Sequence, residues 1–182
     1  MSTGTPEKLL PRRLDPRKLA HQGAVFRGVI AAESLPRLQD AVAAVRRVTA
    51  NIEFRVGDQG EKQGKKIVQG SVAGDLDVIC QRCLEPFNTQ VKSDFTLAVV
   101  WTEEEARQLP SACDPWITGE GEGDLYEILE EELLLSLPVV SFHQGECTDK
   151  ALFSSGDPAE GASGKTPNPF QVLKQLKGNT KT

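Results

Sequence analysis

The sequence has few of the residues on which enzymatic and membrane functions most often depend. Only two of its 182 residues are histidine, and aromatic residues make up 5%. No run approaches the roughly 20 apolar residues that span a bilayer. No nucleophile stands beside a matched base, and no glycine-rich loop has the spacing that binds phosphate. Carboxylates are abundant, but the runs at 103–105 and 130–132 are more typical of solvated helix faces than of acid–base pairs. These absences predict a protein with no enzymatic activity, no small-molecule substrate and no membrane span.

Secretion signals and disulfide patterns are also missing. The stretch MSTGTPEKLLPRRLDP lacks the apolar region of a secretory signal, so we expect a cytoplasmic protein. Because that compartment keeps thiols reduced, the four cysteines are better explained as free thiols or metal ligands than as disulfides.

Regular alternation of apolar and polar residues predicts three long strands in the middle of the chain. The pattern is clearest in 47–56 and recurs in 67–79 and 87–101. Because short connections join these segments, we expect an antiparallel sheet. Two glycines within the second segment permit strong curvature, so the sheet is expected to curl into a barrel-like form. A further strand is expected in 21–31.

Helical patterns flank these strands. The acidic stretch DLYEILEEELLLSLP predicts a helix over 124–138 with Asp124 as its cap. Shorter helices are expected in 34–45, where Ser34 is the predicted cap, and in 102–109. The predicted fold class is therefore α+β: a curled antiparallel, barrel-like sheet with a packed acidic helix and a flexible C-terminal tail.

Changes in composition suggest how the chain is divided. Residues 1–20 are interpreted as an N-terminal extension and 21–153 as a single α+β domain. Residues 154–167 are too rich in Gly, Ser and Pro to bury a core, which predicts a flexible linker. The end of the chain, 168–182, contains NPFQVLKQLK and is predicted to form a docking helix.

Charge is distributed unevenly, although the net charge is only −5. Residues 1–82 carry 14 Lys and Arg against 9 Asp and Glu, whereas 83–182 carry 7 against 17. Such a chain could present a basic surface to nucleic acid and an acidic surface to a basic protein. Each patch alone is equally consistent with an ordinary solvated surface.

The motif CQRCLEPF at 80–87 indicates either redox or metal chemistry. It lies between two predicted strands and contains a proline that favours a turn. A thioredoxin-type pair needs its first thiol at a helix N-terminus, where the thiol pKa is lowered. The predicted geometry is instead a thiol-bearing β-turn that presents two sulfurs to one metal ion. A thiol–disulfide redox protein using Cys80 and Cys83 is the alternative.

A second pair of ligands follows the acidic helix. His143 and Cys147, in HQGEC, would complete a Cys₃His tetrahedron with Cys80 and Cys83. Four protein ligands leave no open position, so zinc bound there would be structural. The spacing is also compatible with unliganded thiols and an exposed loop histidine. Cys113, in PSACDP, is interpreted as a free thiol and is a substitute ligand if His143 is not used.

Three motifs carry a family resemblance. CQRC at 80–83 after a strand, the acidic helix with its leucine-proline end and trailing cysteine, and the proline-led tail at 168–177 occur in this order. With these motifs the chain resembles the YceD-like family of bacterial large ribosomal RNA subunit accumulation proteins. The resemblance implies an accessory factor for the synthesis, processing or stability of 23S ribosomal RNA, with no assigned reaction.

The resemblance also bears on the metal. Family members from other lineages carry two further cysteines after the leucine-proline, and these fall at His143 and Cys147 here. A structural zinc site with one histidine in place of a cysteine is therefore implied.

Direct contact with ribosomal RNA would have to be local. A protein of isoelectric point near 5.2 is a poor general RNA binder, because nonspecific affinity comes from phosphate neutralisation by Lys and Arg. We expect the contact on the polar side of strand 47–56, the adjoining loop and the thiol turn. The predicted residues are Arg47, Arg55, Lys62, Lys65, Lys66 and Arg82.

A basic ribosomal protein or assembly factor is the alternative partner, held by the acidic helix, with the effect on RNA then indirect. The residues predicted to bind it are Asp124, Glu127, Glu130, Glu131 and Glu132, together with Phe170 and Leu173 of the tail.

Overall fold

The computed structural model describes residues 8–58, 60, 63–111 and 113–149. The predicted linker and C-terminal helix, with Phe170 and Leu173, lie outside the described residues, as does Lys62. The predicted boundary after residue 153 therefore stays a prediction.

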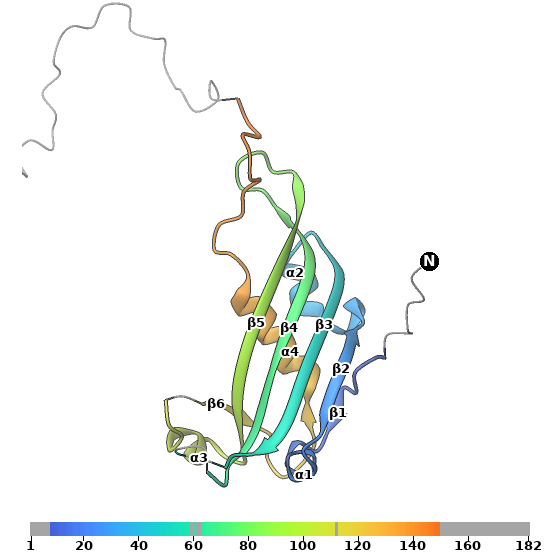
Figure 1. Cartoon of the computed structure of the whole chain (residues 1–182). Coiled ribbons are helices and arrows are strands. Elements are labelled where there is room, and N and C mark those ends of the chain that lie inside the picture. Colours follow the sequence, from blue (N-terminus) through green and yellow to red (C-terminus); the bar gives the residue numbers. More distant parts are fainter. Residues whose placement is uncertain (1–7, 59, 61–62, 112, 150–182) are drawn as a thin grey trace, which may run out of the picture. The chain divides into compact units, whose positions relative to one another are not determined.

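A mixed five-stranded sheet is the central element of the described part of the chain (Figure 1). In spatial order its strands are β2 (Val25–Ile30), β3 (Ala44–Val56), β4 (Lys66–Ile79), β5 (Pro86–Val100) and β6 (Asp114–Ile117). Neighbouring strands are antiparallel except β5 and β6, which are parallel. A separate two-stranded sheet pairs β1 (Arg13–Leu14) with β7 (Gly123–Asp124). The three long strands are confirmed, and the predicted strand in 21–31 is shorter than expected.

Four α-helices accompany the sheet within the described ranges: α1 (Pro16–Gln22), α2 (Pro36–Ala41), α3 (Glu103–Arg107) and α4 (Leu125–Ser136). Asp124 caps α4 as predicted, because its Oδ1 accepts hydrogen bonds from the backbone N–H groups of Tyr126 (3.0 Å) and Glu127 (3.3 Å). The prediction for Ser34 is wrong. That residue ends the short 3₁₀ helix η1 (Ala32–Ser34), and α2 begins after Leu35 with a proline at its first position and no side-chain cap.

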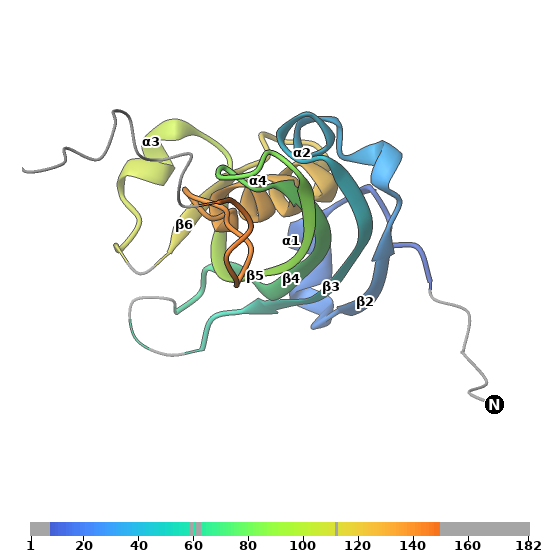
Figure 2. The same cartoon turned by 90° about the horizontal axis from the view of Figure 1, so that it is seen from above.

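The hydrophobic core lies on the concave face of the sheet, which curls around α1 and α4 (Figure 2). Alternate residues of β3, such as Ile52 and Phe54, are fully buried there. They belong to one cluster with Leu125, Leu129 and Leu133, which lie one helical turn apart on α4. Burying a leucine side chain contributes about 1.5–3 kcal/mol, so this stripe fixes the acidic helix against the sheet.

The sheet does not close into a barrel. Among the described strands, β2 and β6 are its two edges, so the fold is α+β with an open, curled sheet, and the barrel-like form is not confirmed. Residues 8–10 run alongside β2, where Leu10 N donates to Val29 O and Val29 N donates to Lys8 O, both at 3.0 Å. Gly28 permits this approach, because a Cβ there would collide with the Lys8 carbonyl oxygen.

Part of the predicted N-terminal extension belongs to the fold. Leu10, Leu14 and Ala20 are buried in the same cluster as the sheet and α4. Asp15 caps α1 by accepting hydrogen bonds from the next backbone N–H groups, and α1 packs against β3 and β4. The structured unit therefore starts before residue 21, contrary to the predicted boundary.

The long strands separate two ends of this unit (Figure 1). We call the β4–β5 connection, 80–85, and the segment 139–147 the knuckle end. We call the loop 57–65 between β3 and β4, together with α1 and α3, the hairpin end. Because β4 has 14 residues, each rising about 3.3 Å, the strand separates the two ends by tens of ångströms.

Candidate metal centre

The first two ligands lie on a tight turn that begins where β4 ends. Cys80 N donates to Glu85 O at 3.0 Å, and Leu84 N donates to Cys80 O at 2.9 Å, so backbone hydrogen bonds hold the turn closed. Leu84 has a φ of 63°, in the left-handed region that favours glycine. Cys80 is fully buried and Cys83 half-buried. The predicted thiol-bearing turn is present, but the hydrogen bond that closes it joins residues four apart, as in an α-turn, rather than three apart as in a β-turn.

The second pair comes from the segment that follows α4, and the turn residues hold this segment in place. Gln81 N donates to Ser141 O at 2.9 Å. Arg82 Nη2 donates to the carbonyl oxygens of His143 (2.7 Å) and Gly145 (2.8 Å). One main-chain bond and two bonds from the Arg82 side chain to main-chain carbonyls thus hold the two halves of the site together.

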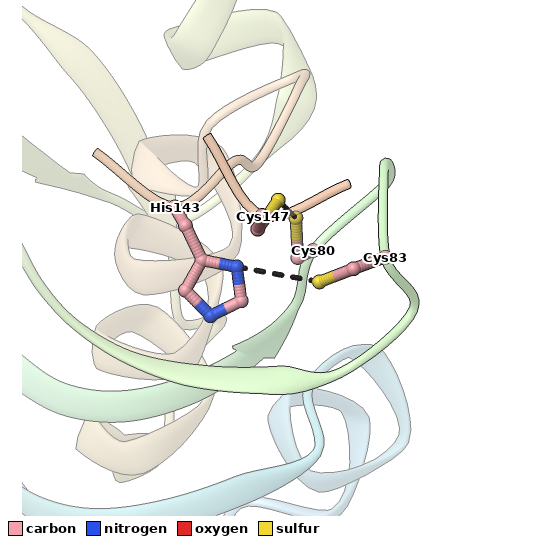
Figure 3. A group of neighbouring side chains, drawn as sticks. All are labelled: Cys80, Cys83, His143 and Cys147. Atoms are coloured by element: carbon pink, nitrogen blue, oxygen red, sulfur yellow. Dashed lines mark hydrogen bonds between the residues drawn. The ribbon is translucent and has the colours of Figure 1, made fainter. Parts of the chain in front are cut away.

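All four side chains point toward one another (Figure 3). Their ligand atoms, three Sγ and a ring nitrogen of His143, lie within 4.8 Å of one another. Cys80 Sγ is 3.6 Å from Cys147 Sγ, and Cys83 Sγ is 3.4 Å from His143 Nδ1. The four residues that the sequence analysis paired therefore form one cluster.

The distances suit a tetrahedral zinc ion. With Zn–S bonds of about 2.3 Å, two sulfurs of a tetrahedron lie about 3.8 Å apart, and a sulfur and a nitrogen lie slightly closer. Both measured edges are within a few tenths of an ångström of these values. Three thiol groups and an imidazole are also the donor set that zinc prefers. The residues present therefore fit zinc.

The electrostatics of the cluster favour a thiolate at Cys80. Burial opposes ionisation, but hydrogen bonds from the backbone N–H groups of Cys83, Arg82 and His143, and from the Cys83 thiol, lower the pKa of Cys80 to about 5. The Glu85 N–H favours the Cys83 thiolate, yet burial and the Cys80 and Cys147 sulfurs raise the pKa of Cys83 above its usual value. Several thiolates at this spacing repel one another, and a cation removes that repulsion.

Two comparisons with known proteins find similar sequences. The family model described as large ribosomal RNA subunit accumulation protein YceD matches residues 68–177, which include the four clustered residues. A protein of Haemophilus influenzae named large ribosomal RNA subunit accumulation protein YceD is 34% identical over 170 residues, covering 92% of this chain and 96% of the relative. The chain belongs to the YceD family. No solved structure matches significantly. The resemblance inferred from the motifs is thus confirmed.

The basic residues predicted to bind RNA are not all brought together in this YceD-family chain. Lys65 and Lys66 lie at the hairpin end, and Arg55 near them contacts Gln69 and Asp58. Arg47 lies further along the outer face of the sheet, beside Asp75 and Lys92. Arg82 lies at the knuckle end, where its guanidinium bridges the two ligand segments and stacks over Phe142 at 5.0 Å. A role for these residues in RNA binding stays a prediction.

Several acidic residues predicted to bind a partner are engaged within the fold. Asp124 caps α4 and pairs with Arg12 at 2.9 Å. Glu130 is 5% exposed and accepts hydrogen bonds from Leu38 N (3.0 Å) and Arg37 Nε (3.2 Å). Two more residues of the group also have partners: Glu131 pairs with Arg37, and Glu132 accepts a hydrogen bond from Ser93. Their part in binding a partner stays a prediction.

Sequence reasoning missed the residues that organise the centre. Ser141 receives the hydrogen bond from Gln81, and Phe87 lies against the His143 ring with 4.8 Å between the ring centroids. Neither has a recognisable spacing, because one acts through its carbonyl group and the other through a ring contact across the fold. Cys113 packs with Ile67 and Ala98, outside the cluster, so the structure does not support it as a substitute ligand.

Proposed function

We propose that this protein is a non-enzymatic accessory factor that supports the accumulation of 23S ribosomal RNA during large-subunit biogenesis in the cytoplasm. The observation that carries the proposal is the 34% identity to a named large ribosomal RNA subunit accumulation protein over nearly the whole of both chains. Among the described helices, none is long and apolar enough to cross a bilayer.

We further propose that Cys80, Cys83, His143 and Cys147 bind a structural zinc ion. The support is the donor set and the two tetrahedral edges of 3.6 and 3.4 Å. The ion would neutralise the thiolates and fasten the β4–β5 turn to the segment after α4. Because all four positions are taken by the protein, no site remains for a substrate or an activated water.

A thiol–disulfide function is the less favoured candidate. The low pKa of Cys80 is common to redox thiols and to metal-bound thiols, and so does not distinguish them. The burial of Cys80 argues against the redox function, because a disulfide substrate has poor access to a fully buried sulfur. We therefore expect the Cys80 thiol of the native, zinc-loaded protein to react slowly with a chromogenic disulfide, and rapid reaction would support the redox function.

The ribosomal function is tested in the organism that encodes the protein. Depleting the protein should lower the ratio of 23S to 16S ribosomal RNA, and a plasmid copy of the wild-type chain should restore it. Unchanged ribosomal RNA after depletion would contradict the proposal. Elemental analysis of protein purified without chelator tests the metal, with about one equivalent of zinc expected. Less than about a tenth of an equivalent, with the cysteines reduced, would contradict the zinc site.

A further inference from the structure

A half-exposed tryptophan stands at the hairpin end, far along the strands from the metal centre. Trp101 follows the last residue of β5, and 44% of its surface is exposed. Its backbone N–H donates to Glu105 Oε2 at 2.9 Å, and Thr102 caps α3 next to it. The main chain that carries the ring is therefore held in a defined position.

One face of the Trp101 ring is covered by an arginine whose orientation is fixed. The guanidinium carbon of Arg17 lies 4.1 Å from the ring centroid. Arg17 Nη2 donates to Thr118 Oγ1 at 2.9 Å and to Gly119 O at 2.6 Å. The guanidinium therefore covers one face of the indole in a fixed orientation, a cation–π arrangement that holds the ring in place.

A surface cavity of about 310 Å³ is lined in part by Trp101. Lys65 and Lys66 line it together with Trp101 and Glu105. Neither lysine forms an ion pair within the part of the chain that the structure describes. Three segments thus contribute to this region: Arg17 of α1 lies on the Trp101 ring at the end of β5, and Lys65 and Lys66 lie where the hairpin loop passes into β4.

We propose that this cavity binds a nucleobase of single-stranded RNA, stacked on Trp101, with the neighbouring phosphates held by Lys65 and Lys66. Single-strand binders combine such aromatic platforms with basic groups that follow the backbone. Bases within a duplex are already stacked on one another and cannot occupy the site. The inference deepens the proposed function and rests on it for the identity of the RNA as ribosomal.

The binding experiment uses the full-length protein and a single-stranded oligoadenylate of about 12 nucleotides, the length scale of single-strand sites. The chain has two tryptophans, and Trp116 is 5% exposed. Trp116→Phe therefore leaves Trp101 as the sole indole, whose emission is expected to be quenched as a base stacks on it. A duplex of the same length is expected to bind about tenfold more weakly or less.

Substitutions at the ring separate stacking from general effects. Trp101→Ala is expected to weaken binding about tenfold, within the range measured for base–aromatic stacking, whereas Trp101→Phe retains a stacking face and most of the affinity. The control is Leu135→Ala, because Leu135 is an apolar residue of α4 that is 74% exposed and does not line the cavity. It should bind as the wild type does, and circular dichroism melts confirm that each variant is folded.

The part that the two lysine charges play in binding is tested by the dependence of RNA affinity on salt concentration. Replacing both Lys65 and Lys66 by Ala should flatten the plot of log affinity against log salt by roughly 0.7 per lost phosphate contact. Lys92→Ala is the control, since Lys92 lies on the outer face of the sheet and pairs with Asp94 at 2.9 Å. It should leave the slope nearly unchanged.

Four outcomes would overturn the inference. The wild type could fail to bind the single strand, or folded Trp101→Ala could bind it undiminished. Trp101→Ala and Leu135→Ala could lose equal affinity, or the duplex could bind more tightly than the single strand. The inference would also be overturned if a ribosomal protein bound the wild type but not Trp101→Ala, while that variant still bound RNA. These results are distinct from failure of the proposed function, which is measured by 23S ribosomal RNA in depleted cells. A chain whose depletion lowers 23S ribosomal RNA but whose Trp101→Ala variant binds RNA normally would retain the proposed function and lose this site.

Discussion

At the residue scale, Leu84 holds a backbone conformation that its side chain opposes. In the left-handed region the Cβ of an L-residue approaches the neighbouring carbonyl oxygen, at a cost of roughly 1–2 kcal/mol. The leucine side chain is 73% exposed, so packing offsets little of this cost. The turn of the metal centre is therefore strained at one position.

Leu84→Gly is expected to stabilise the zinc-loaded protein by about 1 kcal/mol, because glycine adopts this φ without strain. Leu84→Ala is the matched control: alanine keeps the Cβ, so it should give no comparable gain. Urea unfolding midpoints compare the three proteins. Equal stability of the glycine and alanine variants would show that the turn is not strained.

Tyr126 links pH to stability at one residue. Its hydroxyl donates to Leu10 O at 2.6 Å, and burial raises its pKa, although nearby Arg12 opposes the shift. The pKa of Tyr126 is therefore higher in the folded than in the unfolded protein. Its contribution to the free energy of unfolding is fully present below the unfolded-state pKa of about 10, and it is lost as the pH rises through the folded-state pKa.

Tyr126→Phe should therefore lower stability by about 1 kcal/mol at neutral pH, where one hydrogen bond is lost, and by less as the pH rises above about 10. The measurement is the urea midpoint as a function of pH for both proteins. Tyr126 is the only tyrosine in the chain, so the difference between the curves isolates it from the lysines that titrate in the same range. If the two stability curves stayed parallel from neutral to high pH, Tyr126 would not be the source of the pH dependence.

At the scale of elements, the sequence predicts long helices and strands whose apolar residues recur at a regular spacing, and it misses short elements that lack such a spacing. Strands β3, β4 and β5 alternate over many residues, and α4 repeats leucines at helical spacing, so all four were predicted. Strand β6 has four residues and contains a proline, and α1 buries only Pro16 and Ala20. Such short elements form because the assembled sheet offers them a surface, and that information is not local.

The run of three glutamates in α4 shows another limit of prediction from sequence. Glu130, Glu131 and Glu132 look equivalent in sequence, but consecutive helical residues are turned by about 100° from one another. Glu130 therefore points into the junction with α2 and is buried, while the Glu131 side chain is 52% exposed. A run of like charges does not reveal which member is part of the core.

Glu130→Ala is expected to destabilise the protein by about 2 kcal/mol, because it leaves the buried Leu38 N–H without its acceptor and removes one partner of Arg37. Glu131→Ala is the control on the same helix and should cost less than about 0.5 kcal/mol, as expected for an exposed pair. Denaturant unfolding gives both values. Similar small losses in the two variants would mean that α4 tolerates the loss of its buried carboxylate.

At the scale of the whole molecule, the metal centre closes a loop of more than 60 residues, from Cys83 to Cys147. Loop-closure entropy rises only logarithmically with length, so a metal bond that adds several kcal/mol exceeds the cost. Each ligand pair is local in sequence, and the donor types and the family resemblance predicted that the two pairs meet. The geometry of the meeting was not predictable, since it depends on β5, β6 and α4 bringing the chain back to the end of β4.

Removing the zinc with a chelator is expected to lower the melting temperature by about 10 °C or more, because metal affinity is part of the folding free energy. Cys83→Ser should lower both zinc content and melting temperature. Cys113→Ala, which alters a thiol outside the cluster, should keep the full zinc content. A melting temperature that does not respond to the chelator in a zinc-loaded protein would show that the ion does not stabilise the fold.

The two borders of the sheet restrict how other molecules can bind. Residues 8–10 occupy the main-chain groups of β2 at Val29, and on β6 Pro115 has no N–H to donate. A partner therefore has little opportunity to add its own strand to this sheet, and copies of the protein are protected from joining edge to edge into fibres. A partner that approached these two edges would have to contact side chains, which can change in sequence without disturbing the backbone framework.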